Sequence, residues 1–66
     1  MQLFVNGENR ILDKSVSISE FLAAHNLNPK MVVVEHNRVI VPHDQYADVR
    51  LQAGDEIEIV QMMAGG

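Results

Sequence analysis

The feature that most limits the fold of this 66-residue chain is a hydrophobic period that changes twice, from strand-like to helical and back. Residues 1–6 alternate in the manner of a strand. Asn6-Gly7 follows and favours a tight turn, because both central residues of a type I′ turn need a positive φ. We expect this loop to continue through Asn9 and residues 10–14 to form the second strand of a hairpin.

The next segment has helical character. Ser17 and Glu20 are spaced as a capping box, in which each side chain bonds the backbone N–H of the other residue. Phe21 and Leu22 then belong to an apolar face with helical spacing, and Asn26 tolerates the left-handed backbone that ends many helices. A helix of about two turns does not persist alone in water, so it has to pack on a sheet.

Strand-like patterns return in the second half of the chain. Residues 31–35 are nearly all apolar and β-branched, which suits a central strand. Residues 39–41 return after a turn, and we expect residues 43–49 to be irregular. The last strand, 56–61, alternates, with its isoleucines facing inward and its two glutamates outward.

This order of elements predicts an α+β domain of the β-grasp, or ubiquitin-like, fold. We expect a mixed sheet of four to five strands with one main helix on one face, and with the first and last strands parallel at its centre. The domain covers residues 1–61, and residues 62–66 form a flexible C-terminal tail.

Composition excludes several classes of function. The chain has no cysteine, which removes disulfides, thiolate metal sites and cysteine nucleophiles. Nine acidic residues against five basic ones give a net charge of -4, which opposes binding to nucleic acids and to anionic membranes. The longest apolar run, residues 31–34, is too short to span a bilayer, and residues 1–20 lack the apolar core of a signal peptide. We therefore expect a cytoplasmic protein.

Candidate catalytic and metal-binding groups are scattered. His25, His36 and His43 form no local metal motif, so we expect no metal site and interpret His36 and His43 as solvated loop residues. Glu56 and Glu58 share a strand face, which indicates a solvated surface rather than an acid–base pair.

The C-terminal segment is the candidate site. Glycine has no Cβ, so Gly65 and Gly66 can pass through a slit too narrow for other residues. From Gln61 to Gly66 an extended chain spans about 17–18 Å, enough to place a terminal carboxylate deep in another protein's active site. ATP can activate such a carboxylate as an acyl-adenylate. Because the chain has no cysteine, the Gly66 carboxylate is the only obvious group on which this protein could carry sulfur. A frayed end is the alternative interpretation.

The residues before the glycines are candidates for partner binding, because ordering a tail costs about 1–2 kcal/mol per residue and contacts have to offset it. Methionine side chains adapt to a partner's groove, and Val60 lies on the strand face opposite the isoleucines. Met62 has an alternative role, that of closing the core. The candidate partner-binding residues are Val60, Met62, Met63, Ala64 and Gly65.

Taken together, these stretches resemble the ThiS family, the sulfur carrier proteins of thiamine biosynthesis. The resemblance covers essentially the whole chain. It is carried by Asn6-Gly7-Glu8, by residues 34–42 (VEHNRVIVP), by residues 51–60 (LQAGDEIEIV) and by the terminal Ala64-Gly65-Gly66. The sequence departs from the family pattern at His43, where a basic residue is common, and at Tyr46, where tryptophan is common.

The resemblance implies a protein co-substrate rather than an enzyme. A ThiF-type adenylating enzyme would use ATP and Mg²⁺ to adenylate Gly66, and the carrier itself would bind no cofactor. A sulfur donor relay based on a persulfide would then convert the adenylate into a thiocarboxylate. The partner that receives the sulfur would be the thiazole synthase, ThiG, which builds the thiazole ring of thiamine.

Three other functions use the same fold. The chain could be a different β-grasp sulfur carrier, such as the small subunit of molybdopterin synthase, or a ubiquitin-like protein modifier. It could also be a binding module whose tail is inert. The three alternatives predict, respectively, a thiocarboxylate, conjugates with lysines, and no change at the terminus.

Overall fold

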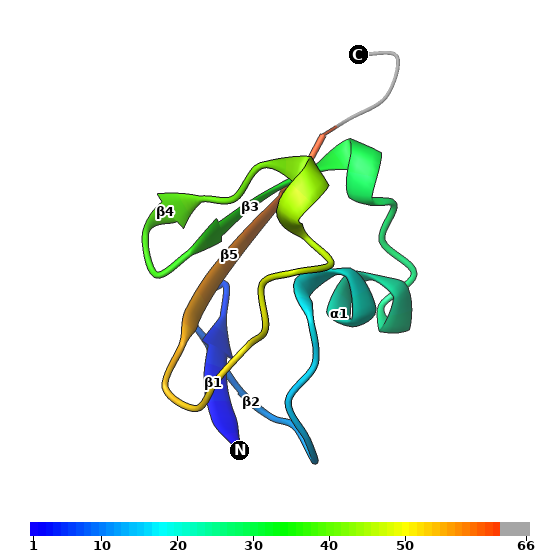
Figure 1. The fold of residues 1–66 in the computed structure, drawn as a ribbon. Coiled ribbons are helices and arrows are strands. Elements are labelled where there is room, and N and C mark those ends of the chain that lie inside the picture. The colour runs from blue at the N-terminus through cyan, green and yellow to red at the C-terminus, as the bar shows by residue number, and fades with distance from the viewer. Residues whose placement is uncertain (63–66) are drawn as a thin grey trace.

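A computed structural model describes residues 1–62 and places five strands in one mixed sheet, in the order β2-β1-β5-β3-β4 (Figure 1). β1 and β5 are parallel and lie side by side within the sheet, and the other neighbours are antiparallel. The strands are β1 (Gln2–Val5), β2 (Glu8–Ile11), β3 (Val32–His36), β4 (Val39–Ile40) and β5 (Glu56–Gln61). The helices are α1 (Ile18–Ala24) and two 3₁₀ turns at Pro29–Met31 and His43–Gln45.

Both ends of α1 follow the signals in the sequence. The Glu20 backbone N–H donates to Ser17 Oγ at 3.0 Å, and the Ser17 N–H donates to Glu20 Oε1 at 2.8 Å. This reciprocal pair confirms the capping box and satisfies two amides that the helix cannot bond itself. Asn26, just beyond the helix, has a φ of 57°, the left-handed conformation that ends it.

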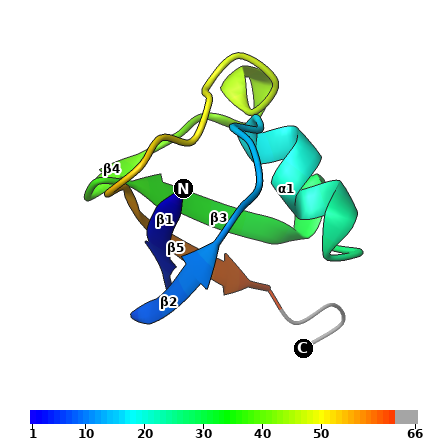
Figure 2. The same cartoon turned by 90° about the horizontal axis from the view of Figure 1, so that it is seen from below.

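The core lies on one side of the sheet. Figures 1 and 2 show α1 and the segment between β4 and β5 on the same side, and none of the helices described within residues 1–62 lies on the other. The helix contributes Ile18, Phe21 and Leu22 to this core. The sheet and the β4–β5 segment supply the remaining buried hydrophobic residues, which are Leu3, Val5, Val32, Val34, Val41, Tyr46, Leu51 and Ile57. The predicted β-grasp arrangement, with one helix on one face, is confirmed.

The second strand differs from the prediction. It begins at Glu8 rather than at residue 10, because the turn consists of Asn6 and Gly7 alone, with φ angles of 51° and 79°. Glu8 therefore pairs directly with Val5. The two-residue turn needs no extension, since both positions already have the positive φ of a type I′ hairpin.

The interpretation of His36 as a solvated loop residue is wrong, whereas His43 is exposed and lies in the segment between β4 and β5, as expected. His36 ends β3, and its Nε2 lies 2.7 Å from Asp55 Oδ2. His43 Nε2 lies 3.0 Å from the Val32 carbonyl oxygen, and Tyr46, three residues on, is only 1% exposed. The segment after β4 is thus folded against the sheet, where Tyr46 fills the core.

Within residues 1–62, none of the helices has the length and apolar character needed to cross a membrane.

Candidate functional site

β5 connects the centre of the sheet to the C-terminal segment. Its pairing with β3 continues past the strand, because the Met62 N–H donates to the Met31 carbonyl oxygen at 2.7 Å. The Met62 side chain remains 44% exposed, so it does not close the core. Val60 is 60% exposed and faces away from α1, as its alternation with the isoleucines predicted. The other predicted site residues, Met63, Ala64, Gly65 and Gly66, lie outside the described residues.

The side of the sheet that α1 does not cover, called the open face below, collects exposed apolar residues from four strands. Strand register places Phe4 beside Glu56, Val33 beside Val60, and Glu35 beside Glu58 on this face. Five of the six large hydrophobic residues that are exposed among the described ones lie here. These five are Phe4, Ile11, Ile40, Val60 and Met62. Because lone exposed apolar residues are common but a shared face is not, this grouping is a candidate interaction surface.

Asn6 holds the middle of β5 in place. Its backbone N–H donates to the Ile57 carbonyl at 2.8 Å, and its side-chain amide bonds both backbone groups of Ile59. The Ile59 N–H donates to Asn6 Oδ1 at 2.7 Å, and Asn6 Nδ2 donates to the Ile59 carbonyl at 3.2 Å. Asn6 thus extends the β1–β5 ladder beyond the end of β1, which fixes the strand that leads to the C-terminal segment.

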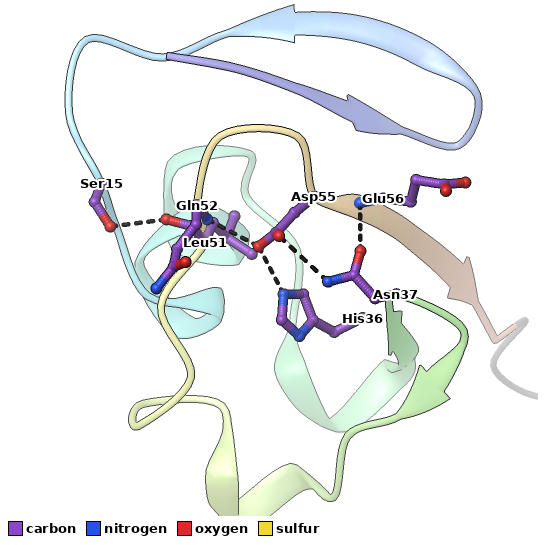
Figure 3. A network of polar contacts seen from close by, with 7 residues as sticks. All are labelled: Ser15, His36, Asn37, Leu51, Gln52, Asp55 and Glu56. Atoms are coloured by element: carbon purple, nitrogen blue, oxygen red, sulfur yellow. Dashed lines mark hydrogen bonds and ion pairs between the residues drawn. The ribbon is translucent and has the colours of Figure 1, made fainter.

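Asp55 holds the beginning of β5 (Figure 3). One of its oxygens, Oδ2, accepts the Gln52 backbone N–H at 2.8 Å and lies 2.7 Å from His36 Nε2. The other, Oδ1, accepts Asn37 Nδ2 at 3.2 Å, and Asn37 Oδ1 accepts the Glu56 N–H at 2.9 Å. The network ties the β3–β4 turn to the loop before β5.

The charge of Asp55 depends on these contacts. Burial raises the pKa of the Asp55 carboxyl, but the hydrogen bonds from His36, Gln52 and Asn37 outweigh burial and leave that pKa below its usual value. Asp55 is therefore an ionised, hydrogen-bonded anchor at neutral pH. The anchor is structural, because its partners are the last residue of β3 and residues of the two loops that flank the start of β5.

The described residues form a support for the strand that leads to the C-terminal segment. Among residues 1–62, no three His, Asp or Glu side chains come close enough together to hold a metal ion. What the geometry offers is a rigid central strand, held at its start by Asp55 and in its middle by Asn6, and an exposed apolar face beside the strand's end. The contribution of Phe4 and Glu35 to this face was missed in the sequence, because it depends on which strands are neighbours.

The sheet order and the single packed helix define the class of this molecule, a ubiquitin-like β-grasp domain. The chain belongs to the ThiS family, which it matches over residues 3–66.

Similar proteins agree with this assignment. A crystal structure of the thiamine biosynthesis protein ThiS from Geobacter metallireducens superposes with a TM-score of 0.85 at 29% identity, with all of both chains covered. The sulfur carrier protein ThiS of Bacillus subtilis is 40% identical over 50 residues, which are 76% of each chain. A thiazole synthase of Paramagnetospirillum magneticum is 38% identical over all 66 residues of this chain. The chain spans only 20% of that synthase's length.

Proposed function

We propose that this protein is the sulfur carrier of thiamine biosynthesis and that the carboxyl group of Gly66 carries the sulfur. The observation that supports this most strongly is the family match, which extends through Ala64-Gly65-Gly66. The Bacillus subtilis relative, a sulfur carrier protein by name, and the Geobacter structure, a thiamine biosynthesis protein, add to it.

The proposed chemistry takes place on the terminal carboxylate. A carboxylate oxygen of Gly66 attacks the α-phosphate of ATP in a ThiF-type enzyme with Mg²⁺, and pyrophosphate leaves. The terminal sulfur of a persulfide in the donor relay then attacks the acyl carbon, and AMP leaves. The product is an acyl disulfide whose S–S bond comes from the persulfide. A second thiol of the relay attacks the relay sulfur of that bond, which forms a disulfide within the relay and leaves a thiocarboxylate on Gly66. The carrier is a co-substrate throughout, because the enzymes supply the catalytic groups.

The proposed acceptor of the sulfur is the thiazole synthase, ThiG. Thiazole synthases of two bacteria contain a region similar to this whole chain, at 38% and 32% identity. A carrier-like region within the same polypeptide as a synthase supports a functional link between the two, since tethering raises their effective concentration. This link supports the proposed transfer of sulfur from Gly66 to the growing thiazole.

The proposed partner contacts are Val60 and Met62 on the open face, together with Met63, Ala64 and Gly65. Val60 and Met62 are 60% and 44% exposed and directly precede the segment that a partner has to take up. We expect Met62→Asp to weaken binding to the adenylating enzyme by about tenfold or more, because a charge would enter an apolar contact. Its melting temperature should change far less, and an equally large loss of stability would contradict this role.

Reconstitution tests the proposed function directly. The protein is incubated with the ThiF-type enzyme of the same organism, ATP, Mg²⁺ and a persulfide donor, and its intact mass is measured. Replacement of one oxygen by sulfur at the terminus is the expected result, and a variant that lacks Gly66 is the control that should fold and stay unmodified. An unchanged wild-type mass would contradict the carrier, and conjugates with lysines would indicate a protein modifier instead.

A further inference from the structure

The open face carries a hollow whose surroundings are acidic. It has a volume of about 300 Å³ and is lined by Phe4, Gly7, Gly54, Glu56, Ile57 and Glu58. This volume is at the lower limit for small-molecule sites, so the hollow fits a single long side chain better than a cofactor. Phe4, which is 39% exposed, supplies an aromatic wall, and two carboxylates stand beside it.

The carboxylates near the hollow have no cationic partner within residues 1–62. The two ion pairs found there involve Asp55 and Glu20, not the glutamates of the open face. Among the strands, Arg10 is the sole cation, and it pairs with Leu3, on the side that α1 covers. Each open-face glutamate therefore presents a negative charge that an incoming partner can neutralise.

Two of these charges oppose each other directly. Glu35 of β3 is the register partner of Glu58 of β5, and like charges in opposite positions of neighbouring strands destabilise a sheet. Glu56 lies two residues before Glu58 on the same face, which adds to the local negative potential. A repulsion of this kind is relieved when a cation binds between the carboxylates.

We propose that this hollow binds an arginine side chain of the ThiF-type adenylating enzyme. The aliphatic part of an arginine packs against Phe4 and its guanidinium bonds Glu56 and Glu58, because the planar fork matches carboxylates and stacks on aromatic rings. An enzyme that binds ATP has basic groups around the phosphates, so its field attracts an acidic carrier. The inference rests on the proposed function, since it assigns a docking contact to the same partner.

The distances permit both contacts at once. Met62 follows Glu58 by four residues, so the hollow lies about 13 Å along the strand direction from the start of the C-terminal segment. A typical protein interface covers about 800 Å² on each partner, a patch roughly 30 Å across. An enzyme that holds Gly66 therefore reaches the hollow and covers Val60 and Val33 between the two points.

A small-molecule probe tests the arginine chemistry without any enzyme. N-acetyl-arginine amide is titrated into the protein, and the Phe4 ring and the backbone amides of Glu56 and Glu58 are followed by NMR. Saturable shifts confined to this region are expected, with much smaller shifts from N-acetyl-leucine amide. Glu56→Gln/Glu58→Gln should abolish them, and equal responses of both proteins to the arginine probe would overturn the proposal.

Binding to the adenylating enzyme tests the docking contact. At low salt, Glu56→Gln/Glu58→Gln should raise the dissociation constant by about tenfold and flatten its salt dependence, as loss of a charged contact does. The matched control is Glu8→Gln, which removes one charge on the side of the sheet that α1 covers and should leave binding unchanged. Unchanged binding of the double variant would overturn the proposal, as would weakened binding confined to thiazole synthase. Failure of the wild-type protein to acquire sulfur would instead count against the proposed function.

Discussion

The two faces of β5 show how one strand divides its side chains between stability and recognition. Ile57 faces α1 and is 2% exposed, whereas Val60, three residues later, points away and is 60% exposed. Both are β-branched and both suit a strand, so composition does not separate them. The difference lies in what covers each face: α1 and the β4–β5 segment cover one, and none of the described elements covers the other.

The exposed apolar residues of the open face are unexpected in a chain of only 66 residues. A chain of this size has a thin margin of stability and gains most from burying every apolar side chain that it can. Leaving Phe4, Val60 and Met62 exposed forgoes part of that gain. On the proposed function, the partners of the carrier cover them when they take up the C-terminal segment.

Shortening a side chain on the covered face should have the largest effect on the free energy of unfolding. Ile57→Ala removes a core side chain that is only 2% exposed, and we expect it to cost about 2–5 kcal/mol of unfolding free energy. Val60→Ala, on the same strand, should cost no more than about 0.5 kcal/mol. Urea denaturation of both variants measures the difference. Comparable losses would show that the open face contributes to the core after all.

Removing the charge of Asp55 should have the next largest effect. Asp55→Asn leaves the Asn37 amide, the Gln52 N–H and His36 without a carboxylate, and we expect a loss of about 1–3 kcal/mol at pH 7. Asp48→Asn, at an exposed position, is the matched control and should be close to neutral. A neutral Asp55→Asn variant would show that the network does not hold the start of β5.

The same carboxylate predicts how stability depends on pH. Because the pKa of Asp55 is lowered in the folded state, its contribution is present above the usual aspartate pKa of about 3.9 and is lost as pH falls through the folded value. The difference in unfolding free energy between wild type and Asp55→Asn should therefore shrink between about pH 5 and pH 2. A difference that stays constant over this range would contradict the charged anchor.

Loss of the helix cap should lower the free energy of unfolding somewhat less than loss of the Asp55 charge does. Ser17→Ala removes the hydroxyl that accepts the Glu20 N–H, and caps of this type contribute about 0.5–2 kcal/mol. Thermal unfolding measures the change, with Ser15→Ala as a comparison, since Ser15 donates to the Leu51 carbonyl rather than to the helix. A larger loss for Ser15→Ala would show that the β4–β5 segment depends on that loop contact more than α1 depends on its cap.

A change on the open face should have the smallest effect on the free energy of unfolding, and it should raise this free energy rather than lower it. Glu58→Gln removes the repulsion with Glu35, so we expect a gain of about 0.2–1 kcal/mol at low salt that disappears at high salt. Glu8→Gln serves as the control. A destabilised Glu58→Gln variant would show that Glu58 has a favourable contact in the free protein.

Much of the fold could be predicted from local signals. The last strand was predicted at its observed bounds because its alternation is regular, and the helix start because Ser17 and Glu20 form a capping box. The second strand was placed too late, since an Asn-Gly pair closes a hairpin without further residues. Burial of Tyr46 was missed because one aromatic residue in a polar segment has no period that indicates a face.

The site was harder to predict than the fold. His36 and Asp55 are 19 residues apart, and β3–β5 pairing brings them together. The open face has the same origin, because Phe4 and Glu56 belong to opposite ends of the chain and become neighbours through the parallel β1–β5 pair. The choice of Gly65 and Gly66 stays a prediction, since both lie outside the described residues, and it rests on residue type rather than on neighbours.

Interface mapping tests the division between the two faces most directly. The isotopically labelled protein is mixed with the adenylating enzyme, and signal loss from cross-saturation is measured for each residue by NMR. We expect signal loss at Phe4, Glu58, Val60 and Met62, with Ala23 and Ala24 on the exposed side of α1 unaffected. Signal loss centred on α1, with the open face unaffected, would contradict this expectation.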